Sequence, residues 1–294
     1  MSVIVTIPPA LITLLLGMGL VLAGLWIGYN VSLLPVDASV NAPIYDDLFK
    51  VLFSIGTVLF LGIVGLLVFS LVRFRRKPGD QGDGEAIEGN LPLEILWTAV
   101  PAIVVLFVGI YSYDIYERMG GMATLNPHAG MNHGASAHQA MQAGVVSGGD
   151  GERLWGGIAR ADGSGEALPV EVSAMQFAFI FHYPDGDITT GELHVPSDRP
   201  VELRMEARDV IHAFWVPQFR IKQDVIPGQP TVLSFTATQP GSYPIVCAEL
   251  CGPYHGGMRS TVVVHPPDEF EEWLASNRPA APPTVASAAL TPTA

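Results

Sequence analysis

Hydrophobic positions divide the chain into an apolar N-terminal part and a C-terminal part built from short alternating segments. Three runs, residues 9–29, 51–72 and 95–113, are long enough to cross a bilayer, which requires about 20 apolar residues. Buried helices of a protein core are usually shorter, at about 10 to 14 residues. The pattern therefore predicts a transmembrane helical hairpin over residues 44–118 and a further hydrophobic segment within residues 1–30.

Basic residues indicate which side of the membrane each loop occupies. The stretch RFRRK, residues 73–77, follows the second run directly, whereas no basic residue precedes Lys50. Loops rich in lysine and arginine stay in the cytoplasm, so everything after residue 118 should lie outside it. The first run lacks the positive start and the small-residue cleavage site of a secretory signal. An uncleaved third helix is therefore favoured over a cleaved signal.

The residue composition changes twice in the part of the chain after the hairpin. Residues 119–167 are rich in glycine and alanine and predict a flexible insertion. From residue 168 to 278, short β-branched or aromatic segments alternate with proline, glycine and aspartate, which is typical of an antiparallel sandwich or barrel. A helical turn around DEFEEWLAS closes this domain, and the Pro/Ala-rich residues 279–294 predict a disordered tail.

The insertion also contains histidines interleaved with methionines. These side chains could capture copper transiently, although a solvated linker is the simpler interpretation. They are His128, His133, His138, Met122, Met131 and Met141.

Composition narrows the possible partners. The formal net charge is −13, with 49% hydrophobic and 15% charged residues. Such an acidic chain argues against nucleic acid as a partner and suits a surface that attracts a basic protein. An acidic surface can also serve solubility alone.

The stretch CAELCGPYHGGM, residues 247–258, holds both cysteines of the chain. Thiolate, imidazole and thioether ligands together favour copper, since structural zinc sites rarely use methionine. One solution is a pair of coppers bridged by both thiolates and capped by one histidine each, which requires a second histidine, and His212 is the best candidate. A Cys247–Cys251 disulfide and a thioredoxin-like copper chaperone are the alternatives, but a chaperone carries its cysteines early, before a helix.

Four segments together resemble subunit II of the haem-copper cytochrome c oxidases, and their amino-acid sequences are most similar to the cyanobacterial type. They are EILWTAVP, AMQFAFIFHYPDG, DVIHAFWVPQFRIKQDVIPG and CAELCGPYHGGM. The resemblance implies a cupredoxin-like Greek-key sandwich anchored by the hairpin. It places that domain on the periplasmic or lumenal side of a cytoplasmic or thylakoid membrane.

The resemblance also implies a ligand set for two copper ions. Both cysteines would bridge the metals and both histidines would cap them, with a weak thioether ligand on one side and a backbone carbonyl on the other. In the family, the side chain of the residue that provides this carbonyl helps to bind magnesium at the interface with subunit I. The residues are Cys247, Cys251, His212, His255, Met258 and, for the carbonyl and the magnesium, Glu249.

Three further positions take roles from the same resemblance. Glu94 matches the glutamate at the mouth of a proton-uptake path, although an acid at a helix start is also a favourable dipole partner. Phe177 and Phe179 both stand where many relatives have a tryptophan. The first of these two positions is the one at which electrons enter in the family. Asp209 resembles an acidic residue that supports docking of the electron donor.

The implied function is that of a subunit within an aa3-type cytochrome c oxidase. The copper centre would accept electrons from cytochrome c or a small copper protein and pass them to haem in subunit I, where oxygen is reduced to water with proton translocation. Subunit III would be a further partner. A membrane-anchored copper storage or delivery protein is the alternative. Related quinol oxidases lack the copper ligands, and nitrous-oxide reductase lacks the hairpin and carries a propeller domain.

Overall fold

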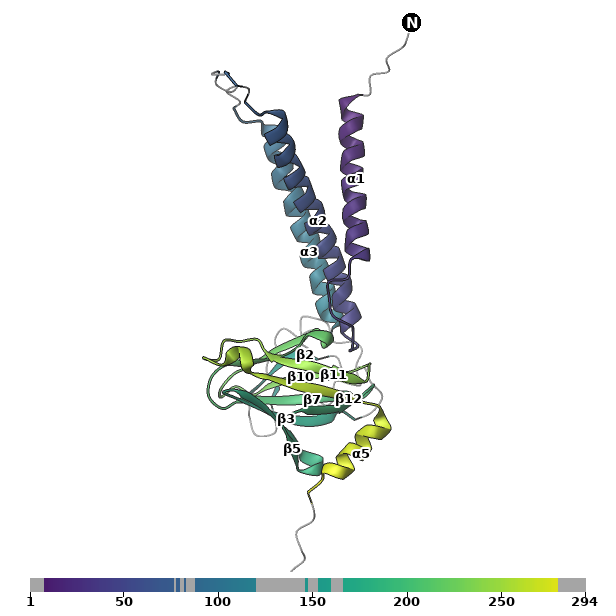
Figure 1. Ribbon diagram of the computed structural model, residues 1–294, viewed down its shortest axis with the longest axis vertical. Helices are drawn as coiled ribbons and strands as arrows, with labels where there is room; N and C mark the ends of the chain where they lie inside the picture. The colour runs from purple at the N-terminus through teal and green to yellow at the C-terminus, as the bar shows by residue number, and fades with distance from the viewer. Residues whose placement is uncertain are drawn as a thin grey trace, which may run out of the picture. The chain divides into compact units, whose positions relative to one another are not determined.

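The computed structural model describes residues 8–76, 78–79, 82, 88–119, 146–147, 153–159 and 166–279. The chain separates into two units (Figure 1). Unit 1 comprises residues 1–37 and 41–121, and unit 2 comprises residues 38–40 and 122–294.

Unit 1 consists of three helices that are long and apolar enough to cross a membrane. They are α1 (Pro9–Asn30), α2 (Ala42–Arg73) and α3 (Leu91–Arg118), and each contains one of the three predicted runs. Large apolar side chains are exposed along all three helices, as expected for helices surrounded by lipid. The hairpin of α2 and α3 and the additional first helix are confirmed.

Two glycines let α1 pack closely against α2. A side chain at Gly24 would collide with Val58, and one at Gly28 would collide with Ser54. Small residues at such an interface allow two membrane helices to approach each other. The retention of residues 1–30 in the mature protein stays a prediction, which this specific packing favours.

Unit 2 is a β-sandwich of two sheets with one terminal helix (Figure 1). One sheet has the strand order β1-β2-β10-β7-β3-β4-β5, and the other has the order β6-β12-β11-β8-β9. The strands are β1 (Val146–Ser147), β2 (Arg153–Ala159), β3 (Leu168–Met175), β4 (Ala178–Tyr183), β5 (Ile188–Thr190), β6 (Leu193–Pro196), β7 (Pro200–Ala207), β8 (His212–Val216), β9 (Ile221–Val225), β10 (Thr231–Thr236), β11 (Gly241–Cys247) and β12 (Arg259–His265).

Most neighbouring strands pair antiparallel, as expected, but three pairs are parallel. β3 runs parallel to β7, β6 to β12 and β2 to β10, because chain segments return to the same sheet after crossing to the other one. β2 also lies within the span predicted as a flexible insertion, so part of that span belongs to the sandwich. The insertion's candidate copper-capturing histidines and methionines, and the predicted tail beyond residue 279, lie outside the described residues.

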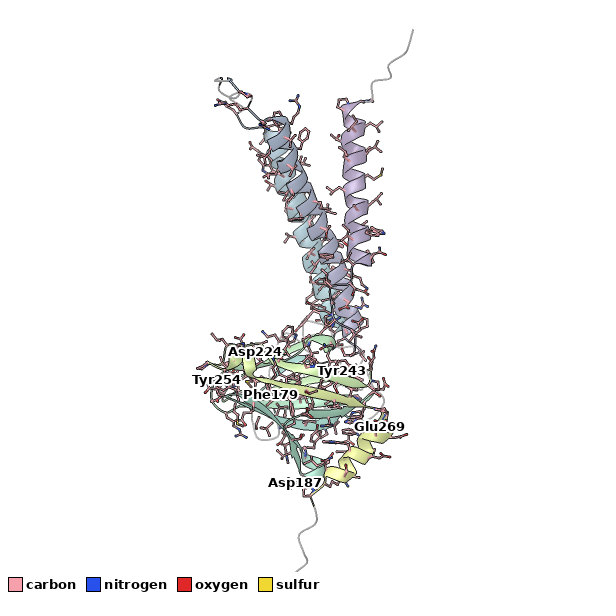
Figure 2. All side chains as sticks on the ribbon, viewed as in Figure 1. Phe179, Asp187, Asp224, Tyr243, Tyr254 and Glu269 are labelled. Atoms are coloured by element: carbon pink, nitrogen blue, oxygen red, sulfur yellow. The ribbon has the colours of Figure 1, made fainter. Side chains whose placement is uncertain are left out.

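Aromatic side chains fill the space between the two sheets. Phe214 of β8 contacts Phe179 and Phe181 of β4 edge to face, with ring centroids 5.9 and 6.5 Å apart. All three are buried, and Figure 2 shows Phe179 inside unit 2. Perpendicular aromatic pairs of this kind add to the free energy gained by burial alone. β4 on one sheet is thereby fixed against β8 on the other.

A short segment ahead of the hairpin also belongs to the sandwich. Ala38 lies in its hydrophobic core, and the Ser39 hydroxyl donates to the carbonyl of Phe219 at 2.8 Å. The Ala38 N–H donates to the Gln218 carbonyl, and the Thr238 N–H donates to the Ala38 carbonyl. Residues 38–40 are thus joined to the rest of unit 2 by backbone pairing as well as by burial.

The terminal helix α5 (Pro267–Asn277) packs next to a pair of histidines. His194 stacks on Trp273 with ring centroids 4.2 Å apart, and its Nδ1 lies 2.8 Å from Nε2 of His265. Burial lowers the pKa of His194 to about 4, with the charge of His265 adding to the effect and Glu192 opposing it. Burial also lowers the pKa of His265, and the carboxylate of Glu269 opposes that shift.

Acidification should destabilise unit 2 through this pair. Between pH 6.5 and about pH 4 the unfolded chain carries a proton on His194 that the folded chain lacks, so unfolding takes up a proton and becomes easier as the pH falls. The free energy of unfolding should drop by up to about 3 kcal/mol, since each pKa unit corresponds to about 1.4 kcal/mol. Denaturant unfolding of the full-length chain across this pH range measures the slope.

Two variants separate this contribution from that of other groups. His194→Leu should flatten the slope, and His182→Gln should keep it, because His182 bonds to Thr189 and lies outside the pair. An unchanged slope in His194→Leu would show that the histidine pair does not govern the acid response.

Candidate metal centre

One loop and two strand ends bring the candidate ligands together. Cys247 ends β11, His255 begins the short 3-10 turn η4 (His255–Gly257), and Met258 directly precedes β12. Cys251 lies in the loop between β11 and η4. A tight loop closed by two paired strands therefore presents four donor side chains within twelve residues.

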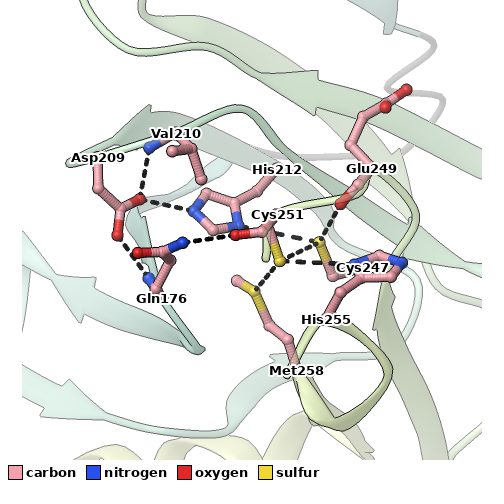
Figure 3. Close-up of polar contacts among 9 residues, drawn as sticks. All are labelled: Gln176, Asp209, Val210, His212, Cys247, Glu249, Cys251, His255 and Met258. Carbon is pink, nitrogen blue, oxygen red and sulfur yellow. Dashed lines mark hydrogen bonds and ion pairs between the residues drawn. The ribbon is translucent and has the colours of Figure 1, made fainter. Parts of the chain in front are cut away.

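The sulfur atoms form the centre of the cluster (Figure 3). The Sγ atoms of Cys247 and Cys251 are 3.8 Å apart, well beyond the roughly 2.05 Å of a disulfide bond, and both thiols are free and buried. His255 Nδ1 lies 3.5 Å from Cys251 Sγ, and Met258 Sδ lies 3.7 Å from the same atom. The backbone carbonyl of Glu249 lies 3.3 Å from Cys247 Sγ.

His212 reaches the cluster from the first position of β8. Its Nδ1 lies 3.9 Å from Cys247 Sγ, and the two residues belong to neighbouring strands, since Phe214 pairs with Cys247. The donor atoms of His212, Cys247 and Cys251 all lie within 4.8 Å of one another. The structure therefore brings together all six predicted donors, including the one predicted from outside the loop.

Asp209 orients the His212 ring. Its Oδ1 lies 2.8 Å from Nε2 of His212, so the ring donates its Nε2 proton and leaves Nδ1 free to face the sulfur atoms. The other carboxylate oxygen accepts the Gln176 N–H at 2.7 Å. Burial opposes ionisation of Asp209, but the hydrogen bonds from His212, Gln176 and Val210 outweigh it and lower the pKa of the carboxyl.

Asp209→Ala should weaken copper binding about 10- to 100-fold, the usual effect of losing a partner that orients a metal-bound histidine. The measurement is copper affinity of the full-length chain in competition with a chelator. Asp224→Ala is the matched control, because that carboxylate is half-exposed and pairs with Lys222 instead. Equal affinities in Asp209→Ala and wild type would show that Asp209 does not orient the ligand.

The donor set fits copper better than other metals. Two thiols, two imidazoles, a thioether and a carbonyl form a soft and mixed set, whereas magnesium and calcium require oxygen ligands. Burial, with a further contribution from neighbouring Cys247, raises the pKa of the Cys251 thiol to about 11. A cation that binds this sulfur must therefore displace its proton.

The loop approaches Gln176 and Phe177 closely at one glycine. The Gln176 Nε2 donates to the Cys251 carbonyl at 2.6 Å. Gly252 has a φ of +134°, and a Cβ there would lie 2.8 Å from Gln176 Nε2 and 3.3 Å from Phe177 Cζ. Only glycine fits this position. Phe177 is thus placed beside the cysteine loop, as expected for a residue near the metal.

Two of the predicted site residues point elsewhere. The carboxylate of Glu249 turns away from the sulfur cluster (Figure 3) and lies 3.9 Å from Lys222 Nζ. Glu94 lies in the first turn of α3, within unit 1. The hydrogen bonds of Asp209 to His212 and Gln176 were not predicted from the sequence. The one signal in the sequence was the spacing D-x2-H of Asp209 and His212, which indicates only the first of these bonds.

Two family models match this chain. A family model described as "Cytochrome C oxidase subunit II, transmembrane domain" matches residues 25–115. A second, described as "Cytochrome C oxidase subunit II, periplasmic domain", matches residues 187–265 and so covers the metal-binding loop.

Individual relatives extend the match to most of the chain. Proteins named cytochrome c oxidase subunit 2 from Synechocystis sp. and Thermostichus vulcanus are each 47% identical, over 93% and 92% of this chain and 84% and 86% of their own lengths. The crystal structure of the periplasmic domain of cytochrome oxidase subunit II from Bradyrhizobium japonicum is 28% identical over 41% of this chain and 96% of that domain, with a TM-score of 0.37. The chain belongs to the cytochrome c oxidase subunit II family.

Proposed function

We propose that the chain receives electrons at a two-copper centre in unit 2 and delivers them to subunit I of an aa3-type cytochrome c oxidase. Cys247 and Cys251 would bridge the metals, His212 and His255 would cap them, and Met258 and the Glu249 carbonyl would be weaker ligands. Bound there, the copper pair would supply a one-electron carrier whose charge is shared between two metals. The observation that carries the proposal is the central pair of free, buried sulfurs 3.8 Å apart with one imidazole beside each.

The chain's own residues prepare this site in four ways. Both cysteines would bind the metals as thiolates and release their protons to solvent, and Asp209 holds His212 in the tautomer that presents Nδ1. Burial of both sulfurs excludes water, which limits rearrangement of solvent when charge arrives. Gln176 fixes the Cys251 carbonyl and so the path of the loop.

Electron paramagnetic resonance of the copper-loaded full-length chain, with metal analysis, tests the proposal. Two coppers per chain and a seven-line hyperfine pattern are expected when one unpaired electron is shared by two copper nuclei. A four-line spectrum with a single copper would contradict the shared centre. It would favour copper storage or delivery, which needs an exchangeable site, whereas the sulfurs of this cluster are buried.

Family membership supports a proposal for the electron donor and the partner subunits. A soluble cytochrome c or a small copper protein would supply the electrons, and the acidic net charge of −13 would attract a basic one. Subunit I would hold the haems and the site of oxygen reduction, and subunit III would complete the complex. The half-exposed carboxylate of Glu249 would help to bind magnesium at the contact with subunit I.

Glu94 would admit protons to the assembled complex. It lines a shallow pocket on α3 with Ile95, Thr98, Ala99 and Ala102, an open surface that a partner helix could cover. Glu94→Ala should slow oxygen reduction coupled to proton uptake while leaving reduction of the copper centre by the donor unchanged. The test measures two rates on the same complex. Steady-state turnover gives the rate of oxygen reduction, and rapid mixing with the donor gives the rate of reduction of the copper centre. Unchanged turnover would remove Glu94 from the proton path.

A further inference from the structure

A cavity lies between the end of α1 and the beginning of α2, within unit 1. Its volume is about 100 Å³, and it is lined by residues 28–34 and by Asp46, Phe49 and Lys50. The two helices lie side by side at this end (Figure 1), where Gly28 approaches Ser54. None of the lining residues belongs to the metal centre, so the cavity is a separate feature of the chain.

The cavity lies at the outer surface of the membrane. The apolar runs, residues 9–29 of α1 and 51–72 of α2, end and begin at its walls. From here the chain continues into residues 38–40 of unit 2, the unit that contains the match to the periplasmic domain. Trp26 and Tyr29 are 65% and 63% exposed, as expected for aromatic side chains at the level of the lipid headgroups.

Lys50 provides a positive charge at this level. It is the one basic residue among the first 72 positions, and it stands at the outer end of α2, although basic residues usually gather at the cytoplasmic side. Its ammonium lies 3.3 Å from the Asp47 carboxylate and is 41% exposed. An ammonium has three N–H donors, so this exposed pair leaves donors for an anion in the cavity.

Neutral donors and a carboxylate complete the lining. Ser32 and Leu33 follow the end of α1 and belong to no strand, and their backbone N–H groups donate to no other described residue. The Asp46 side chain, which accepts hydrogen bonds, lines the same cavity. A ligand that combines an anionic group with hydroxyl groups would satisfy both kinds of lining atom.

The surroundings favour a lipid over a soluble anion. Large apolar side chains next to the cavity are exposed on both helices, including Leu22 and Leu25 of α1 and Leu52 of α2. Acyl chains attached to the bound headgroup would cover these side chains, and burial of apolar surface adds to the binding free energy. A soluble anion would gain the polar contacts alone.

We propose that this cavity binds the headgroup of an anionic, hydroxyl-bearing lipid of the outer leaflet, with the phosphate at Lys50 and the hydroxyl groups at Asp46. The acyl chains of this lipid lie along α1 and α2. The inference is independent of the proposed electron transfer, because no copper ligand takes part. It requires that residues 1–30 stay in the mature protein, since α1 forms one wall.

Photo-crosslinking tests the position of the lipid. The full-length chain is reconstituted into phosphatidylcholine vesicles with a small share of phosphatidylglycerol that carries a photoreactive group at the start of one acyl chain. Mass spectrometry of the peptides should find the label at residues 22–34 and 46–53, next to the cavity. Lys50→Gln should lower this label about fivefold, the effect of one lysine on attraction to an anionic lipid.

A second basic residue of the same helix provides the matched control. Arg73 lies in the last turn of α2, at the opposite end from the cavity, so Arg73→Gln should keep the label at the cavity. Equal label in Lys50→Gln and wild type would overturn the proposal. An equal loss in Arg73→Gln would overturn it too, because general attraction to positive charge would then explain the label.

Two further measurements identify the ligand. Phosphatidylcholine with the same photoreactive group should label the cavity less than phosphatidylglycerol, and equal labelling would contradict recognition of the headgroup. An excess of free glycerol phosphate should leave the label in place, and displacement would indicate a site for a soluble anion instead. The intact mass of each sample shows whether residues 1–30 are present, and a mature chain without them would overturn the proposal.

Discussion

Cys247→Ser should abolish the two-copper centre and, with it, electron acceptance from the donor. The Cys247 sulfur lies within 4 Å of Cys251 Sγ, His212 Nδ1 and the Glu249 carbonyl, so it has the central place among the donors. A serine hydroxyl is a hard ligand and keeps its proton at neutral pH, so it cannot replace a bridging thiolate for copper. Metal analysis and electron paramagnetic resonance of the copper-loaded chain measure the loss directly.

A weaker ligand provides the control for this loss. Met258→Leu removes only the thioether and keeps a buried side chain of similar volume at a fully buried position, so both coppers should be retained with a shifted spectrum. Full turnover, or a retained seven-line spectrum, in Cys247→Ser would refute the bridging role. Loss of copper from Met258→Leu as well would mean that the loop as a whole, rather than the sulfur bridge, determines binding.

Phe214→Ala should destabilise unit 2 by about 4 kcal/mol, within the range for truncating a buried phenylalanine. The ring is fully buried between Phe179 and Phe181, and its removal leaves a cavity between the two sheets. The loss should extend to the metal, since Phe214 pairs with Cys247 across the strands and lies two residues after His212. Denaturant unfolding gives the stability, and chelator competition gives the copper affinity.

Trp215→Ala is the neighbouring comparison. The Trp215 side chain is partly exposed, so its truncation should cost clearly less stability than the loss of Phe214. Comparable losses in both variants would show that β8 contributes through its backbone pairing rather than through the ring in the core. A folded Phe214→Ala chain with wild-type copper affinity would show that the core and the metal loop are independent.

The candidate ligands were predictable because most of their spacing is local. Four of the donor side chains lie within residues 247–258, and the chemistry of a soft donor set follows from residue types alone. The three membrane helices were predictable for a similar reason, since each is a continuous apolar run. His212 was predicted by the need for a second imidazole and by the resemblance, and the structure places it beside Cys247.

Features that depend on tertiary contacts were not predictable from the pattern. Asp209 meets Gln176 across 33 positions, and His194 meets His265 across 71, so no short-range spacing indicates either pair. β2 lies in a glycine-rich stretch without alternation, where pairing with β10 prevails over weak strand propensity. Glu94 and the magnesium role of Glu249 stay predictions, because both depend on a partner subunit.

Because Ala38 belongs to the core of unit 2, a fragment made only from residues after the hairpin omits part of the sandwich. The sandwich is discontinuous in sequence, because residues 38–40 are separated from its other strands by the whole membrane hairpin. A soluble fragment that starts after the hairpin would lack a buried side chain and leave the Gln218 carbonyl and the Thr238 N–H without their backbone partners. Such an open edge invites pairing with another chain. An excised domain should therefore be made with a short peptide spanning Ala38–Val40 fused to it or added in trans.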